Sequence, residues 1–181
     1  MIGITGQIGA GKSFVGQILR DRGFKVLDAD KAVHELYCCD TDLRKAIAVE
    51  FGAESLIEDG VNRKFFADLI FEDESARKRL ENLVYPALTE FVVQQNPDYV
   101  EAALFENVPE MVERMDQFWI VTAPEKVRLA RLVKQRHLSA EDALRRIELQ
   151  RLKDDPKVWK SLLLNKPLRF IINDGETSLD I

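Results

Sequence analysis

The residues with the clearest chemical role form a run near the start of the chain that matches the pattern G-x-x-x-x-G-K-[ST]. The run consists of Gly6, Gln7, Ile8, Gly9, Ala10, Gly11, Lys12 and Ser13. The glycines of such a loop let backbone N–H groups approach an anion, because no Cβ atom stands in the way. The lysine reaches the β- and γ-phosphates of a nucleotide, and the serine hydroxyl is a ligand for Mg²⁺. The pattern predicts binding of a nucleoside triphosphate with Mg²⁺.

The segments that flank this loop have the periodicity that it requires. Residues 1–5 are apolar, and from Phe14 onward apolar residues recur four positions apart until Gly23. We expect a strand over 1–5 and a helix over 12–22 whose positive dipole end faces the phosphates. Phe14 is then a nucleotide-site residue. A chance glycine-rich turn is the alternative, and the strand–turn–helix context argues against it.

Strands and helices alternate along the rest of the chain. Strands are expected over 24–27, 99–105, 118–122 and 168–172, and helices over 124–135 and 140–151. This order predicts an α/β fold with a P-loop NTPase-like parallel sheet of about five strands, flanked by helices. Residues 31–95 interrupt the alternation. They look wholly helical, with breaks at Asp40-Thr41, Gly52, Asp59-Gly60, Asp73 and Pro86. We predict a helical insertion at the carboxyl edge of the sheet.

Acidic residues end two of the expected strands. In Asp28-Ala29-Asp30, a carboxylate can deprotonate an acceptor hydroxyl or hold a metal. The two acids point the same way only if the strand extends through Asp30, which is equally well explained as the N-cap of a helix starting at Lys31. Glu106 ends the second apolar run. It either contacts metal or substrate or simply ends its strand, and the local sequence leaves both choices open.

A basic cluster lies in the last third of the chain. It consists of Arg128, Arg131, Lys134, Arg136, Arg145, Arg146, Arg151 and Lys153. A solvated helix face explains most of these residues. A kinase also needs cations that close over the transferring phosphoryl group and exclude water. With Ser139 as a suitable N-cap for the returning helix, residues 131–160 are a reasonable lid.

Composition narrows the class of protein. A chain of 181 residues, 46% hydrophobic and 31% charged, is typical of one soluble core domain with insertions. The net charge of −5 argues against a nucleic-acid partner. No apolar run reaches the roughly 20 residues that cross a bilayer, and a first strand at residue 1 leaves no room for a leader. Cys38 and Cys39 lack metal-ligand spacing, so we interpret them as packing or surface thiols. We expect a cytoplasmic protein that is monomeric or weakly self-associating, without a membrane partner.

Taken in order, the motifs resemble those of the dephospho-CoA kinase family over essentially the whole chain. They are T-G-x-I-G-x-G-K-S at 5–13, V-x-D-A-D at 26–30, R-x-x-x-x-x-x-I-F at 63–71, L-F-E at 104–106, V-T-A-P-E at 121–125, R-L-x-R-L at 128–132, R-I-x-x-Q at 146–150 and I-x-N-D-G at 171–175. The loop is generic to many kinases. The D-A-D, L-F-E and R-I-x-x-Q motifs in this order are much more specific.

The resemblance implies ATP-dependent phosphorylation of the ribose 3′-hydroxyl of dephospho-CoA, with Mg²⁺. It implies that Asp30 is the catalytic base beside Lys12. Residues 31–95 would bind the coenzyme, 131–160 would be the lid, and 1–30, 96–130 and 161–181 would form the nucleotide-binding core. Arg131, Arg136 and Asn173 would contact ATP, the last at the adenine. Asp28, Arg63, Tyr85 and Glu106 would lie on the acceptor side.

The chain departs from the family pattern at a few positions. Tyr85-Pro86 stands where relatives carry His-Pro, which keeps a hydrogen-bond donor but loses a titratable group. Ala102-Ala103 replaces a proline, Gln135-Arg136 moves the lid arginine by one position, and the chain ends at Ile181, where relatives begin a final helix. The loop and Asp30 are intact, so we expect an active enzyme. Its affinity for substrate is the property that these departures can alter.

Three alternatives belong to other classes. A GTPase needs N-K-x-D, and the segment at 165–168 reads N-K-P-L without the aspartate. Another small-molecule P-loop kinase, for nucleoside monophosphates or sugar acids, would need an arginine pair in a different insertion. A catalytically silent nucleotide-binding protein is suggested by Tyr85 and the short C-terminus.

Overall fold

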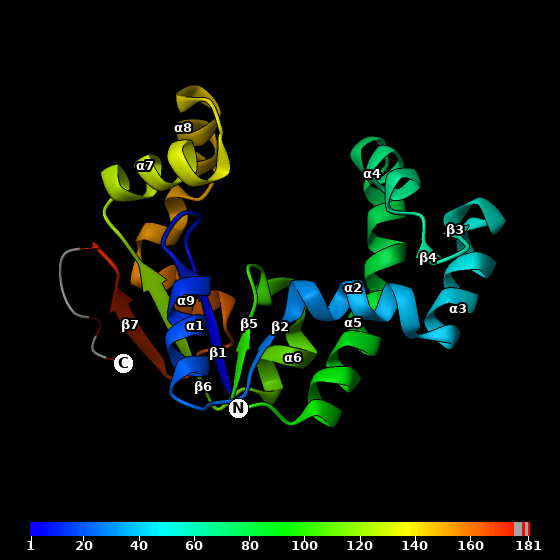
Figure 1. Cartoon of the computed structure of the whole chain (residues 1–181), viewed down its shortest axis with the longest axis horizontal. Coiled ribbons are helices and arrows are strands. Elements are labelled where there is room, and N and C mark those ends of the chain that lie inside the picture. Colours follow the sequence, from blue (N-terminus) through cyan, green and yellow to red (C-terminus); the bar gives the residue numbers. More distant parts are fainter. Residues whose placement is uncertain (176–178, 180) are drawn as a thin grey trace. The chain divides into compact units, whose positions relative to one another are not determined.

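The computed structural model describes residues 1–175, 179 and 181, with only the backbone described for residues 71 and 72. The described residues form two units. One comprises Met1–Leu27 and Pro97–Ile181, and the other comprises Asp28–Asn96. The first unit carries the main sheet and the second is largely helical (Figure 1).

The first unit is built on a five-stranded sheet with the order β2-β5-β1-β6-β7. Its strands are β1 (Ile2–Gly6), β2 (Val26–Asp28), β5 (Tyr99–Glu101), β6 (Gln117–Thr122) and β7 (Leu168–Ile172). Strand β1 pairs in parallel with β5 and β6, and β6 pairs in parallel with β7. Parallel strands need crossover connections, which helices usually supply. The predicted α/β fold with a parallel sheet is confirmed.

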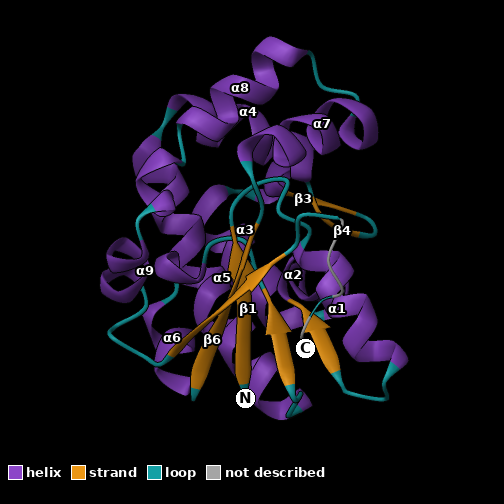
Figure 2. Ribbon diagram, turned by 90° about the vertical axis from the view of Figure 1, so that its left-hand side faces the viewer, coloured by secondary structure: helices purple, strands orange, loops and turns teal. Residues whose placement is uncertain are grey.

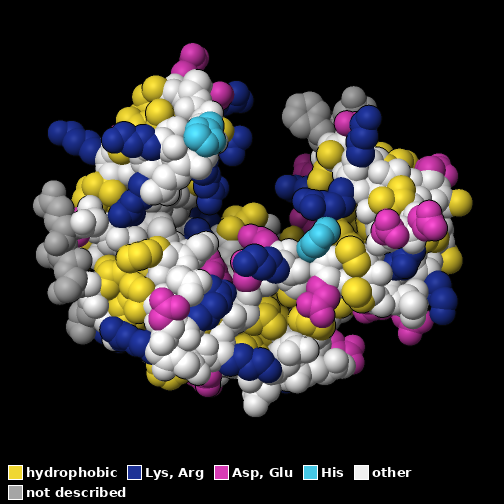
Figure 3. All heavy atoms as spheres, viewed as in Figure 1, with side chains coloured by type: hydrophobic (Ala, Val, Ile, Leu, Met, Phe, Trp, Pro, Cys, Tyr) yellow, Lys and Arg dark blue, Asp and Glu magenta, His cyan; other side chains and the backbone are white. Residues whose placement is uncertain are grey.

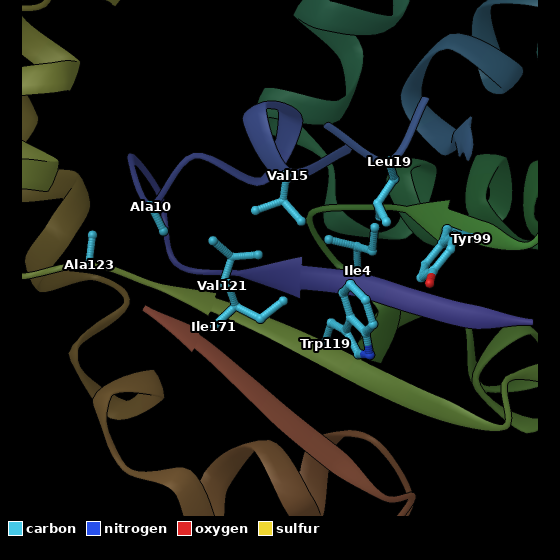
Figure 4. Packing of buried hydrophobic residues seen from close by; sticks show 9 residues of the cluster. All are labelled: Ile4, Ala10, Val15, Leu19, Tyr99, Trp119, Val121, Ala123 and Ile171. Carbon is cyan, nitrogen blue, oxygen red and sulfur yellow. The ribbon is translucent and has the colours of Figure 1, made fainter. Parts of the chain in front are cut away.

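Helix α1 (Lys12–Asp21) packs on one face of this sheet. Its Val15 and Leu19 belong to a buried cluster that also contains Ile4, Trp119 and Val121 (Figure 4). Side chains alternate between the two faces of a strand, and the neighbours Phe118 and Trp119 of β6 are both buried, so both faces of this central strand carry apolar residues.

The opposite face of the sheet is packed by a second set of aromatic residues. Phe118 precedes Trp119 in β6 and lies edge to face against Phe105, with ring centroids 5.0 Å apart. Helix α6 (Pro109–Arg114) lies on the side of the sheet opposite to α1 (Figure 2). The central strands are therefore covered on both faces, as the sequence predicted.

Two of the predicted strands have different bounds in the structure. The second strand begins at Val26 rather than Phe24, because the Phe24 N–H donates to Leu19 O at 3.1 Å and so helps to close the end of α1. The predicted strand 99–105 ends at Glu101, and Phe105–Asn107 forms a 3₁₀ turn, η2. The Val108 N–H donates to Phe105 O at 2.8 Å, so local bonds replace sheet bonds there.

The second unit contains four α-helices among its described residues: α2 (Ala29–Cys39), α3 (Thr41–Phe51), α4 (Arg63–Glu72) and α5 (Glu74–Gln95). The predicted breaks at Asp40, Gly52 and Asp73 are confirmed as helix boundaries. The expectation that 31–95 is wholly helical was wrong. After a 3₁₀ turn η1 (Ala53–Ser55), the strands β3 (Leu56–Ile57) and β4 (Gly60–Val61) pair as a hairpin around the Asp59-Gly60 turn signal.

The predicted break at Pro86 was also wrong, because α5 runs through this residue. A proline inside a helix removes one hydrogen bond and costs about 3 kcal/mol or more. The buried residues of α5 recur every four positions on both sides of Pro86, at Ala76, Leu80, Val84, Leu88 and Val92. Packing of this apolar stripe keeps the helix continuous.

The last third of the chain, which belongs to the first unit, contains α7 (Glu125–Arg136), α8 (Ala140–Glu148), the 3₁₀ turn η3 (Arg151–Asp154) and α9 (Pro156–Leu162). Ser139 caps α8 as predicted, since its hydroxyl accepts from the Asp142 N–H at 3.0 Å. Helix α8 ends three residues earlier than expected, because the Gln150 N–H bonds to Ile147 O at 3.0 Å in a tighter turn. None of the helices in the described ranges has the length and apolar character of a membrane span.

Candidate active site

The loop Gly6–Ser13 joins the carboxyl end of β1 to the first turn of α1. Gly9 and Gly11 have φ values of 75° and 91°, in the left-handed region that favours glycine. A Cβ atom on Gly9 would lie 2.9 Å from Arg128 O, and one on Gly11 would lie 2.3 Å from Asn173 Nδ2. Within the described chain, no side chain caps the first turn of α1, so its N–H groups can bind an anion.

Replacing Gly11 by alanine is expected to weaken ATP binding by about tenfold or more, because the methyl group would displace the Asn173 amide and strain the loop. Isothermal titration with ATP measures the loss. Gly23→Ala is the matched control, because Gly23 has a φ of 89° and a Cβ atom there would meet no described atom within 4 Å. Equal affinities of the two variants for ATP would contradict this role of Gly11.

Ser13 is hydrogen-bonded to an acid that is not among the site residues predicted from the sequence. Its hydroxyl donates to Glu101 Oε1 at 2.7 Å. Glu101 ends β5, is 6% exposed and has an ion pair with Arg20 at 4.0 Å. Its Oε2 atom has no hydrogen-bond partner among the residues that the structure describes. An acid inside the apolar run 99–105 was the signal available in the sequence.

Two further predicted site residues, Lys12 and Glu106, contact groups of the protein itself. Lys12 Nζ is 3.3 Å from Gly6 O, so the lysine folds back over its own loop. Glu106 lies in η2, not at the end of a strand, so the strand-end interpretation of this acid was wrong. Its side chain is 14% exposed and forms an ion pair with Lys153. Contact of Glu106 with a metal or an acceptor stays a prediction.

Asn173 and Arg131 hold the middle of the loop from two other elements. Asn173, which follows β7, is buried and donates through Nδ2 to Ala10 O at 2.9 Å. Arg131 of α7 donates to Ala10 O at 3.1 Å and to Asn173 Oδ1 at 3.1 Å. The structure therefore brings both predicted ATP residues to the loop. In this structure their polar atoms bind loop carbonyl groups and each other.

A pocket of about 570 Å³ opens beside this network. Its lining includes Gly11, Phe14, Ile18, Arg131, Gln135 and Asn173. Phe14 is 57% exposed and adds an apolar surface next to the loop. Arg136, at the end of α7, is exposed and does not line this pocket, whereas its neighbour Gln135 does. The pocket is the candidate nucleoside site.

Basic side chains gather over α7 and α8 (Figure 3). Lys134, Arg136, Arg145 and Arg146 are all exposed, in agreement with a solvated face. Arg128 differs from them, because it is 3% exposed and pairs with Asp154 at 3.3 Å. The cluster therefore contains at least one buried structural cation.

The second unit carries Asp28 and Asp30 at the start of α2. Asp28 is the N-cap, and its Oδ1 accepts from the N–H groups of Asp30 and Lys31 at 3.1 and 3.2 Å. The N-cap interpretation of Asp30 was therefore wrong. Strand β2 ends at Asp28, so the two acids do not continue one extended strand. Asp30 is exposed in the first turn of α2.

Two further predicted acceptor-side residues, Arg63 and Tyr85, also lie in the second unit, whereas Glu106 belongs to the first. Arg63 is exposed at the start of α4, and Tyr85 is half-buried on α5. Burial raises the pKa of Tyr37, and the positive charge of Arg63 partly opposes this rise. Cys38 and Cys39 are free, exposed thiols in the described chain. The Phe71 side chain of the R-x-x-x-x-x-x-I-F motif lies outside the described residues.

Loop and sheet together define a P-loop nucleotide-binding fold. The sequence profile of the family described as dephospho-CoA kinase matches residues 1–167. Dephospho-CoA kinases of Staphylococcus aureus and Staphylococcus epidermidis are each 32% identical over 160 residues, which is 83% of this chain and 76% and 78% of theirs. The chain belongs to the dephospho-CoA kinase family, whose enzymes catalyse the last step of coenzyme A biosynthesis.

Solved structures agree in fold. A Thermus thermophilus protein is 26% identical with a TM-score of 0.71, covering 97% of this chain and 88% of its own. A dephospho-CoA kinase of Campylobacter jejuni is 24% identical with a TM-score of 0.63, covering 96% and 87%. The second comparison shows likeness of fold only.

Proposed function

We propose that this protein transfers the γ-phosphoryl group of ATP to the ribose 3′-hydroxyl of dephospho-CoA. Membership of the family supports the choice of acceptor. The observation that carries the choice of donor is the loop Gly6–Ser13, which leaves the first N–H groups of α1 open and joins Ser13 to a buried acid. The pocket beside Phe14 accommodates the nucleoside.

In the proposed reaction, each unit contributes a different function. Lys12 stabilises the negative charge of the transferring phosphoryl group, and Asp30 accepts the proton of the acceptor hydroxyl. Residues 31–95 bind the coenzyme through groups that include Arg63 and Tyr85. We propose a narrower lid than 131–160, because Arg131 is hydrogen-bonded to the loop and Trp159 is fully buried, and we place it between His137 and Glu148.

The residues around Ser13 fit Mg²⁺. Mg²⁺ in kinases is held by one or two protein oxygens together with substrate phosphates and water. Ser13 supplies a hydroxyl, and Glu101 supplies a buried carboxylate oxygen that has no hydrogen-bond partner in the described chain. When bound, the ion neutralises charge that develops on the phosphates. We propose that Ser13 holds it directly and that Glu101 orients the Ser13 hydroxyl or a metal-bound water.

Glu101→Gln is expected to raise the Mg²⁺ concentration for half-maximal activity by about tenfold, the lower end of the effect of removing an outer partner of a metal site. The amide keeps the shape but removes the charge. Titration calorimetry with ATP in EDTA should give the wild-type affinity, because the substitution acts through the metal. Glu110→Gln, at an exposed site on α6, is the control. A Mg²⁺ titration that overlays the wild-type curve would refute this assignment.

An acceptor screen tests the proposed function. Purified protein is incubated with MgATP and either dephospho-CoA, a panel of nucleoside monophosphates, gluconate or no acceptor, and ADP release is followed by a coupled assay. We expect ADP release that depends on dephospho-CoA. Release stimulated by another acceptor would instead establish a different small-molecule kinase, and release with no acceptor would contradict kinase function.

We also propose a cytoplasmic protein that is monomeric or weakly self-associating. The two exposed free thiols on α2 support a reducing compartment. Cell fractionation and light scattering during gel filtration test these two proposals.

A further inference from the structure

One residue of the nucleotide loop is connected to a distant segment by both its backbone and its side chain. The Ile8 N–H donates to Gln150 Oε1 at 2.7 Å. The Ile8 side chain packs against the buried cluster of Leu132, Ala143 and Ile147, which comes from α7 and α8. The loop and this helical pair therefore meet at Ile8.

The residues on either side of Ile8 rest on the same support. Gln7 is 4% exposed and donates through Nε2 to Asp154 Oδ1, which also accepts from buried Arg128 at 3.3 Å. A Cβ atom on Gly9 would meet the Arg128 backbone. The first half of the loop thus lies on α7 and on residues 150–154.

Residues 150–154 also have contacts with parts of the first unit outside the loop. Lys153 forms an ion pair with Glu106, and its carbonyl group accepts from Trp159 Nε1 at 2.8 Å. Trp159 is fully buried. Gln150 therefore lies where a fixed segment begins, two residues after the end of α8, and its side-chain oxygen reaches the loop from this anchored position.

We propose that Gln150 is a positioning residue that holds the nucleotide loop in its ATP-binding conformation. This inference rests on the proposed binding of ATP by the loop. Gln150 does not line the candidate nucleoside pocket among the described residues, so it acts through Ile8 and not by touching the nucleoside. Loss of the acceptor leaves an N–H group unpaired and lets the loop sample other conformations. ATP then binds more weakly because it must order the loop.

A pair of substitutions separates the hydrogen bond from the rest of the side chain. Gln150→Glu keeps an acceptor oxygen at the same reach, whereas Gln150→Met keeps the length without an acceptor. We expect Gln150→Met to weaken ATP binding by about tenfold and Gln150→Glu by about threefold or less. Glu113→Met, at an exposed site on α6 in the same unit, controls for the introduction of a methionine and should bind ATP like the wild type.

Amide hydrogen exchange of Ile8 gives a second measurement that needs no ATP. In the nucleotide-free protein, exchange at Ile8 should be faster in Gln150→Met and close to wild type in Gln150→Glu. If wild-type protein fails to bind ATP, the proposed function fails, and the exchange data still test the link. If Gln150→Met binds ATP as tightly as the wild type and exchanges the Ile8 amide at the wild-type rate, the inference is overturned. Equal losses of ATP affinity in Gln150→Met and Gln150→Glu would also overturn it.

Discussion

Replacing Lys12 by alanine is expected to lower kcat by about a thousandfold or more, the scale of losing a preorganised donor to a transferring phosphoryl group. The loop places this lysine at the start of α1, where the helix N-terminus adds positive potential. In the structure, Lys12 Nζ contacts Gly6 O at 3.3 Å, and phosphate oxygens are stronger acceptors for an ammonium group. Steady-state kinetics with saturating ATP and dephospho-CoA measure the loss.

The control for Lys12→Ala is Lys160→Ala, because Lys160 is exposed on α9. It removes one positive charge from the same unit and should leave kcat near the wild-type value. In thermal unfolding, Lys12→Ala should lower the free energy of unfolding by no more than about 1 kcal/mol, the net contribution of a typical hydrogen bond, because half-buried Lys12 bonds to Gly6 O. Turnover of Lys12→Ala at the wild-type rate would remove the loop from the mechanism.

Asp30→Asn is expected to lower kcat by about 10²–10⁴-fold, the range for loss of a general base. The amide has the same shape as the carboxylate but cannot accept the hydroxyl proton. Asp28, not Asp30, caps α2, so the free energy of unfolding should be nearly unchanged. Kinetics and thermal unfolding on the same preparation test both parts of this prediction.

Asp28→Ala provides the matched comparison for stability. Loss of an N-cap costs about 1 kcal/mol, which corresponds to a fall in Tm of roughly 2–4 °C for a domain of this size. Asp30→Asn should therefore lower kcat and leave Tm nearly unchanged, whereas Asp28→Ala should lower Tm. If Asp30→Asn loses stability and retains kcat, Asp30 is a structural residue and the base lies elsewhere.

The parts of the fold that could be predicted are those with strong local periodicity. The strand at 168–172 has the predicted bounds, and α1 begins at Lys12 as expected, because glycine, lysine and an apolar stripe specify its start. The bounds of β5 and the continuity of α5 depend on packing. The stripe of buried residues in α5 outweighs the helix-breaking tendency of Pro86, and only this tendency is visible in the local sequence.

The candidate site also combines locally encoded features with features that depend on the fold. The loop Gly6–Ser13 could be predicted because its chemistry is contained in eight consecutive residues. The partners of Ser13 and Ile8 could not, since Glu101 is 88 positions from Ser13 and Gln150 is 142 positions from Ile8. Gln150 is part of the R-I-x-x-Q motif, but the motif itself does not say what its glutamine contacts. The same limit applies to Asp28, whose capping role depends on where β2 ends.

The position of the phosphate in the product distinguishes phosphorylation of the ribose 3′-hydroxyl from any other use of ATP. Wild-type protein, MgATP and dephospho-CoA are incubated together, and the product is examined by ³¹P and ¹H NMR. We predict one new phosphomonoester on the ribose 3′-oxygen, formed together with one ADP per product. A phosphate at another position, or ATP consumed with dephospho-CoA unchanged, would contradict the account.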